Sequence, residues 1–158
     1  MNAAVAVGIA AGCALAGKLS GSEVRFYLVR AGAAGVAGSC ALITLIGFLG
    51  VPGRTAQWML YPLFAILGVS SGLYAVPLQV FLQARPPAKL KGRMIGAMNF
   101  VNWVGILLAA GLYELGASLL KDGDPPAYHW LFAAAGGLMV PVAAFYKPAD
   151  AHLGAAES

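Results

Sequence analysis

Residues 55–84, TAQWMLYPLFAILGVSSGLYAVPLQVFLQA, contain no charged side chain over 30 consecutive positions. A helix that crosses a membrane needs about 20 mostly apolar residues, because the hydrocarbon core is about 30 Å thick. This run is long enough for one crossing with turns to spare. It therefore predicts a transmembrane helix over residues 57–84.

The composition of the whole chain agrees with that interpretation. Of 158 residues, 60% are hydrophobic and 10% are charged, whereas soluble domains carry about 25% charged residues. So few charges exclude a water-soluble globule, and the high apolar content excludes a disordered chain. The predicted transmembrane spans cover approximately residues 2–17, 27–50, 57–84, 94–117 and 127–146.

These runs predict an all-α integral membrane protein of about five transmembrane helices. They are too long for the strands of an outer-membrane barrel, and they lack the alternation of apolar and polar residues that such strands need. We expect one polytopic helical domain over residues 1–146 and a short cytoplasmic tail over residues 147–158.

The basic residues predict how the helices are oriented. If every run crosses the membrane, two basic residues lie on one side, Arg54 and Lys121, and eight lie on the other: Lys18, Arg25, Arg30, Arg85, Lys89, Lys91, Arg93 and Lys147. Cytoplasmic loops carry the excess of Lys and Arg, so the C-terminus is predicted to be cytoplasmic and the N-terminus outside. The net charge of +4 does not indicate nucleic-acid binding, because these residues occupy short breaks and form no exposed basic face.

The beginning of the chain does not resemble a signal peptide. Met1 opens directly into an apolar run with no positive residue before it, whereas a signal peptide has a charged n-region. An outside N-terminus, a short first span and an odd number of helices lead to the hypothesis that the chain is a fragment of a longer protein.

Glycines spaced four residues apart predict where helices pack closely. In a bilayer, helices associate through small residues and through polar side chains. The residues expected to pack are Gly68, Gly72, Gly92 and Gly96, and Gly8 and Gly12 have the same spacing.

Amide side chains mark the helix faces that should avoid lipid. At 100° per residue, Gly68, Gly72, Gln79 and Gln83 fall on one stripe, and lipid would leave the two amides without hydrogen bonds. Asn99 and Asn102 also share a face. Two interpretations remain open for such amides: hydrogen bonding between helices, or lining of a polar cavity. The candidate cavity-lining residues are Tyr74, Gln79, Gln83, Asn99 and Asn102.

Sequence motifs for catalysis or metal binding are absent. The chain has no phosphate-binding loop, no HExxH or GxSxG motif, and no pair of carboxylates within a span. Cys13 and Cys40 lie inside apolar runs, and His129 and His152 lack metal-ligand partners and are expected to be solvated. We therefore expect no enzyme, no cofactor and no metal site.

Three segments resemble a known family. Residues 17–25, GKLSGSEVR, are similar to the degenerate second copy of the major facilitator loop signature, which joins the eighth and ninth helices. Residues 72–83, GLYAVPLQVFLQ, and 92–102, GRMIGAMNFVN, resemble the tenth and eleventh helices of the lysophospholipid transporter branch. The resemblance covers roughly residues 5–146. Tyr27 to Arg30 stand where relatives tend to have Gly-Leu-Val-Pro, and Gln79 stands where an Asn is common.

The resemblance implies the C-terminal half of a major facilitator carrier, with the five runs as helices eight to twelve. It implies movement of lysophospholipid across the inner membrane by rocking of two six-helix halves, with a missing N-terminal half or another membrane protein as partner. The cytoplasmic basic residues Arg85, Lys89, Lys91 and Arg93 would then attract anionic headgroups, or they would serve only to set the topology.

Two other functions remain open on sequence grounds. One is a carrier of the same superfamily for another small solute, such as a drug, a sugar or an organic anion. The other is a helical assembly subunit that transports nothing and uses its glycine faces to bind partner membrane proteins.

Overall fold

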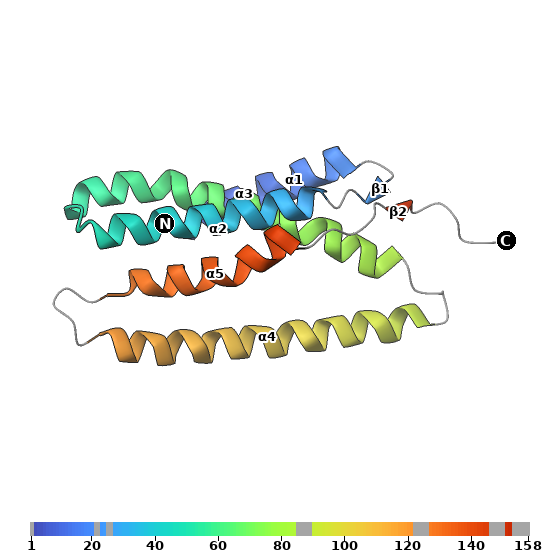
Figure 1. The fold of residues 1–158 in the computed structure, drawn as a ribbon. Helices are drawn as coiled ribbons and strands as arrows, with labels where there is room; N and C mark the ends of the chain where they lie inside the picture. The colour runs from blue at the N-terminus through green and yellow to red at the C-terminus, as the bar shows by residue number, and fades with distance from the viewer. Residues whose placement is uncertain are drawn as a thin grey trace.

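The computed structural model describes residues 2–20, 23–24, 27–84, 90–121, 127–145 and 151–152. The described part is a bundle of long helices that run side by side (Figure 1). The helices are α1 (Asn2–Ser20), α2 (Tyr27–Phe48), α3 (Gly53–Ala84), α4 (Lys91–Leu120) and α5 (His129–Phe145). The predicted fold class, all-α with about five helices, is confirmed.

Length and apolar composition make this a multi-pass membrane protein. Within the described residues, the four helices α1 to α4 are long and apolar enough to cross a bilayer, and α5 is a shorter apolar helix of 17 residues. The limits of the membrane-embedded spans and the assignment of residues 147–158 as a tail stay predictions, and most of that tail lies outside the described residues.

Helices α1 and α3 pack through glycines on both helices. A Cβ atom placed on Gly72 would lie 2.7 Å from the backbone nitrogen of Cys13, and one on Gly12 would lie 2.9 Å from Cα of Val69. Gly8 and Gly68 face each other in the same way. These contacts are with backbone atoms, which cannot move aside, so only glycine allows the two helices to come this close.

Helix α2 packs against α3 on one side and α5 on the other. Gly32 approaches α3, because a Cβ atom there would lie 2.7 Å from the carbonyl oxygen of Ser70. Gly136 of α5 approaches α2, because a Cβ atom there would lie 2.8 Å from Cβ of Cys40. Neither Gly32 nor Gly136 has a glycine four positions away, so glycine spacing does not identify them.

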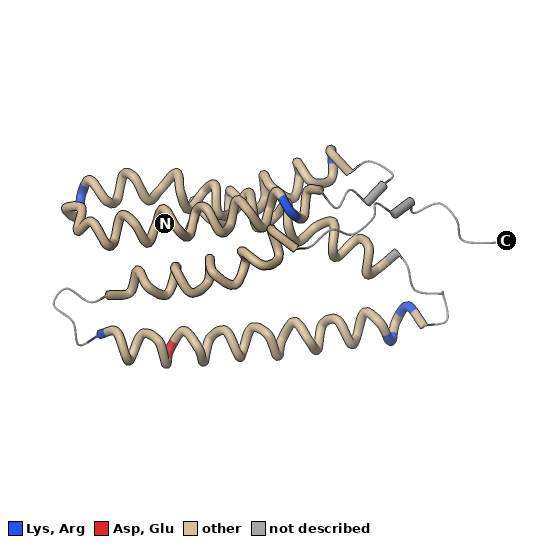
Figure 2. Tube along the Cα trace, in the orientation of Figure 1, with Lys and Arg blue, Asp and Glu red and all other residues tan. Residues whose placement is uncertain are grey.

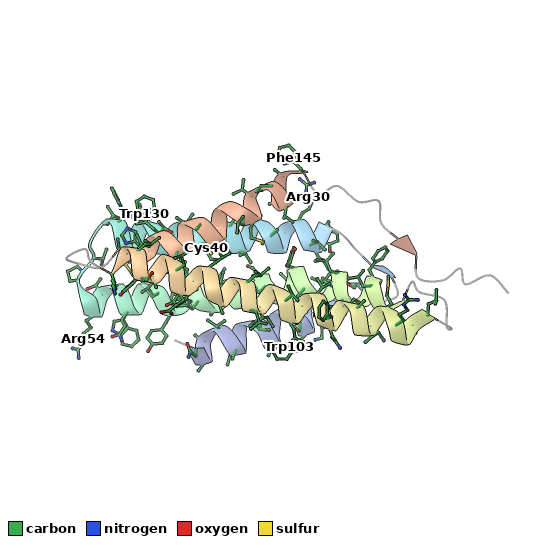
Figure 3. The ribbon with its side chains drawn as sticks, turned by 90° about the horizontal axis from the view of Figure 1, so that it is seen from below. Arg30, Cys40, Arg54, Trp103, Trp130 and Phe145 are labelled. Carbon is green, nitrogen blue, oxygen red and sulfur yellow. The ribbon has the colours of Figure 1, made fainter. Side chains whose placement is uncertain are left out.

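Two hydrogen bonds join α2 and α5 near opposite ends of the pair. Arg30 Nε donates to the carbonyl oxygen of Ala143 at 3.2 Å, and Arg30 lies beside the end of α5 that carries Phe145 (Figure 3). Ala143 is in the last turn of α5, where carbonyls have no partner within the helix. At the other end, the Thr44 hydroxyl shares its one proton between two carbonyl oxygens, that of His129 in α5 at 3.2 Å and that of Cys40 in its own helix at 2.8 Å.

The Thr44 bond predicts a measurable effect on stability. Thr44→Val should lower the free energy of unfolding by about 0.6 kcal/mol, the average for hydrogen bonds between membrane helices. Thr44→Ser keeps the hydroxyl and should retain that stability. The free energy can be measured by titration with sodium dodecyl sulfate. A loss of stability in Thr44→Ser but not in Thr44→Val would show that the methyl group, and not the hydroxyl, carries the contact.

A short strand pair links two distant parts of the chain. Strand β1 (Glu23–Val24) pairs antiparallel with β2 (Ala151–His152), with Glu23 opposite His152 and Val24 opposite Ala151. The pair brings the segment between α1 and α2 together with a segment after α5. Both segments were predicted to lie on the same side of the membrane, and they lie at the same end of the bundle (Figure 1).

Most of the described basic residues lie near the two ends of the bundle (Figure 2). Arg54, in the first turn of α3, and Lys121, directly after α4, lie at the end that holds the turn between α2 and α3. Lys18, in the last turn of α1, and Lys91 and Arg93, in the first turn of α4, lie at the end that holds β1 and β2. This distribution agrees with the predicted division of the basic residues between the two sides of the membrane.

Helix α4 stands apart from the other helices (Figure 1). None of its residues is buried, and it makes few contacts with α3 and α5. A Cβ atom placed on Gly92 or Gly96 would meet nothing within 4 Å. Packing through these two glycines therefore stays a prediction, and it needs a partner outside the described residues.

Candidate functional site

A cavity of about 700 Å³ lies between the second half of α3 and the first half of α4. All five candidate residues from the sequence line it. Helix α3 contributes Tyr74, Gln79 and Gln83, and α4 contributes Asn99 and Asn102. Because side chains three and four positions apart share a helix face, the two amides of each helix can line the same space.

The four amides are available to a ligand. Gln79, Gln83, Asn99 and Asn102 are exposed on the protein surface, while Tyr74 is half-buried. Within the described residues, no hydrogen bond joins these amides to another helix. An amide without a hydrogen-bond partner is costly in an apolar environment. A ligand with polar groups, or water, would satisfy them here.

The remaining lining residues are apolar. They lie near the amides on the same two helices and were not among the candidates from the sequence: Leu82, Met94, Ala97, Met98 and Val101. Methionine is flexible and fills irregular space, so it adapts to ligands of variable shape. Amides combined with apolar side chains suit a molecule that has both a polar head and an apolar tail.

The glycine and amide parts of the α3 stripe have different neighbours. Gly68 and Gly72 are buried against α1, whereas Gln79 and Gln83 face the cavity. Pro77 lies between the two parts, and its side chain is fully buried. Proline has no backbone N–H, so the helix loses one internal hydrogen bond at this point.

Part of the basic segment adjoins the cavity. Arg93 lines a smaller cavity of about 250 Å³, and Met94 and Ala97 line both cavities. Lys91 is exposed on the first turn of α4. Arg85 and Lys89 lie outside the described residues. The structure therefore places one predicted cation, Arg93, next to the amide-lined cavity.

The histidine of α5 is placed differently from its prediction. From the sequence, His129 is expected to be solvated, but its side chain is half-buried and lines a second cavity at the other end of the bundle. The contact arises because Gly47 of α2 has no side chain and leaves room for the His129 ring. His152 is part of β2.

Within the described residues, no cluster of three His, Cys, Asp or Glu side chains is placed to hold a metal ion. Cys40 is buried, Cys13 is half-buried, and both are free thiols. Both are small side chains that pack between the helices.

Five apolar helices with an amide-lined cavity define a multi-pass helical membrane protein with a candidate ligand site. The chain is similar to curated proteins named lysophospholipid transporter LplT. It is 35% identical over 129 residues to that of Klebsiella pneumoniae subsp. pneumoniae and 36% identical over 130 residues to that of Klebsiella pneumoniae strain 342. It is 34% identical over 119 residues to that of Shigella flexneri.

The similarity covers most of this chain but a small part of each relative. It spans 80% of the chain for both Klebsiella proteins and 73% for the Shigella protein, but only 29% and 27% of those relatives. The resemblance to the lysophospholipid transporter branch is thereby confirmed. No protein-family model matches the chain, and no solved structure matches it.

Proposed function

We propose that this chain forms part of a secondary carrier that moves lysophospholipid across the inner membrane. The observation that carries the proposal is the cavity between α3 and α4, which is lined by every amide that the sequence singled out. The three relatives are named as lysophospholipid transporters, which supports the cargo class. The five helices would correspond to helices eight to twelve of a major facilitator carrier.

The chemistry of the cavity fits a lysophospholipid. Gln79, Gln83, Asn99 and Asn102 can donate hydrogen bonds to the oxygens of a glycerophosphate headgroup. The apolar lining can contact the start of the single acyl chain. Arg93, beside the cavity, adds a positive charge near the position of the phosphate.

A binding measurement tests the cargo directly. The purified chain in phosphatidylcholine nanodiscs should bind fluorescent lysophosphatidylethanolamine, and unlabelled lysophosphatidylethanolamine should displace it. Excess sugars, organic anions or hydrophobic drugs should leave the label bound. Displacement by one of those solutes, with lysolipid inert, would instead favour a carrier for another cargo.

The exposed surface of α4 supports a second part of the proposal. In the membrane, further helices from outside this chain would pack against α4. It exposes large apolar residues along its length, including Phe100, Trp103 and Leu107. Its glycines at 92, 96, 105 and 111 have open space beside them, and small residues allow close helix contact. The partner would be the other half of the carrier, or another membrane protein if the chain is an assembly subunit.

Cysteine labelling tests the proposed orientation. Cysteines at Lys18 and Lys91 should react with a membrane-impermeant maleimide only after the inner membrane is opened. Cysteines at Arg54 and Lys121 should react in intact spheroplasts, because the end with fewer basic residues is expected to lie outside. The reverse pattern would invert the proposed topology, and mixed labelling at one end would show that a helix does not cross.

A further inference from the structure

A second cavity, of about 490 Å³, lies at the opposite end of the bundle from the amide-lined one. It is formed by the end of α2, the start of α3 and the start of α5. Its apolar walls include Ile43, Leu60 and Phe132, one from each helix. No residue lines both this cavity and the amide-lined cavity, so the two are separate.

The lining of this cavity changes from polar to apolar with depth. Tyr128, directly before α5, and His129, its first residue, line the cavity, and Phe132 follows about one turn deeper. On α2, Ile43 and Ile46 lie deeper than Gly50 at the turn, and they are only 5% and 8% exposed. The cavity thus has a polar edge at the end of the bundle and a closed apolar floor.

Exposed tryptophans indicate where the polar edge lies in the bilayer. Trp58 and Trp130 are 73% and 51% exposed at this end, and Trp130 and Arg54 both lie there (Figure 3). Tryptophan is enriched at the level of the lipid headgroups. The polar edge therefore lies at headgroup level, and the floor lies at the level of the acyl chains.

The polar edge is held in place by its neighbours. The backbone oxygen of His129 accepts the Thr44 hydrogen bond, and the rings of His129 and Trp130 lie 5.4 Å apart. On the α2 side, Gly47 makes room for the His129 ring, because a Cβ atom there would lie 2.7 Å from its Cγ. A group fixed in this way loses little entropy when a ligand binds.

We propose that this cavity binds one acyl chain of a phospholipid from the surrounding leaflet, with the headgroup against Tyr128 and His129. Its volume is within the range of about 300–1,000 Å³ for ligand pockets, and an apolar cavity of about 150 Å³ already holds benzene. The phenol and imidazole can donate hydrogen bonds to phosphate or ester oxygens.

Photolabelling of the chain tests this site, whatever its cargo. The purified chain is placed in nanodiscs of phosphatidylethanolamine and phosphatidylglycerol with a trace of phospholipid that carries a diazirine on its acyl chain. After illumination, mass spectrometry should find labelling at Ile43, Ile46 and Phe132 about tenfold above that at Leu42 and Leu45, the ratio that a preference of 1.4 kcal/mol gives. The two leucines are 50% and 49% exposed on the same helix, so they report random contact with lipid.

A matched pair of variants locates the effect. Ala56 lines the cavity and Ala41 is an exposed residue of α2 outside it. Ala56→Phe should reduce the cavity labelling to the level of the leucines, and Ala41→Phe should leave it unchanged. Equal labelling of cavity and leucine positions in the wild-type chain would overturn the proposal, even if Ala56→Phe fails to fold. Displacement of the probe by lysophospholipid alone, and not by diacyl phospholipid, would also overturn it.

Discussion

Gly72→Ala is expected to lower the free energy of unfolding by about 2 kcal/mol, in the range for an overpacked interior. The added Cβ atom would lie 2.7 Å from the backbone nitrogen of Cys13 and 2.8 Å from the carbonyl carbon of Gly12. Both are backbone atoms of α1, so α1 and α3 must separate to make room. That separation would also weaken the neighbouring contact of Gly8 with Gly68.

Gly105→Ala is the matched control, and its effect should have the opposite sign. A Cβ atom at Gly105 meets nothing within 4 Å, and alanine is favoured over glycine in a helix by up to about 1 kcal/mol. Unfolding in sodium dodecyl sulfate measures both variants. Gly12→Ala should resemble Gly72→Ala, and the double variant should lose less than the sum, because both changes separate the same helices. Equal destabilisation at Gly72 and Gly105 would contradict the packing of α1 on α3.

The fold class could be predicted because the signal does not depend on knowing which face of a helix is buried. A stretch such as residues 55–84 is identified by its length and its lack of charge alone. Helix packing could not be predicted in the same way, since most of the surface of each helix is apolar and no single apolar stripe marks the packed face. Glycine spacing does not identify the partner: Gly68 and Gly72 contact α1, while Gly92 and Gly96, with equal spacing, have open space beside them.

The candidate site could be predicted in part because amides are scarce in an apolar chain. Gln79 and Asn99 stand out on their helices, and the structure places both on one cavity. The choice between cavity lining and helix-to-helix bonding required the positions of α3 and α4, which no local pattern gives. The bonds from Arg30 to Ala143 and from Thr44 to His129 connect residues 113 and 85 positions apart, so they were also beyond local sequence patterns.

The double variant Gln79→Leu with Asn99→Leu is expected to weaken lysophosphatidylethanolamine binding roughly 30-fold. Each amide removed from a hydrogen bond with the headgroup costs about 1 kcal/mol, and 1.4 kcal/mol corresponds to a tenfold change in affinity. The two residues come from different helices, α3 and α4, and line the same cavity. Leucine is close in size, so the loss reports hydrogen bonding more than shape.

Two further variants separate this effect from a general loss of amide groups. Gln57→Leu changes an exposed glutamine of α3 that lies outside the cavity, so binding should remain as in the wild-type chain. Gln79→Asn keeps an amide in the cavity and should retain most of the affinity. Binding is measured by displacement of the fluorescent lysolipid in nanodiscs, with helix content checked by circular dichroism. Unchanged affinity in a folded double variant would remove Gln79 and Asn99 from the site, because the headgroup would then be held by residues other than these two amides.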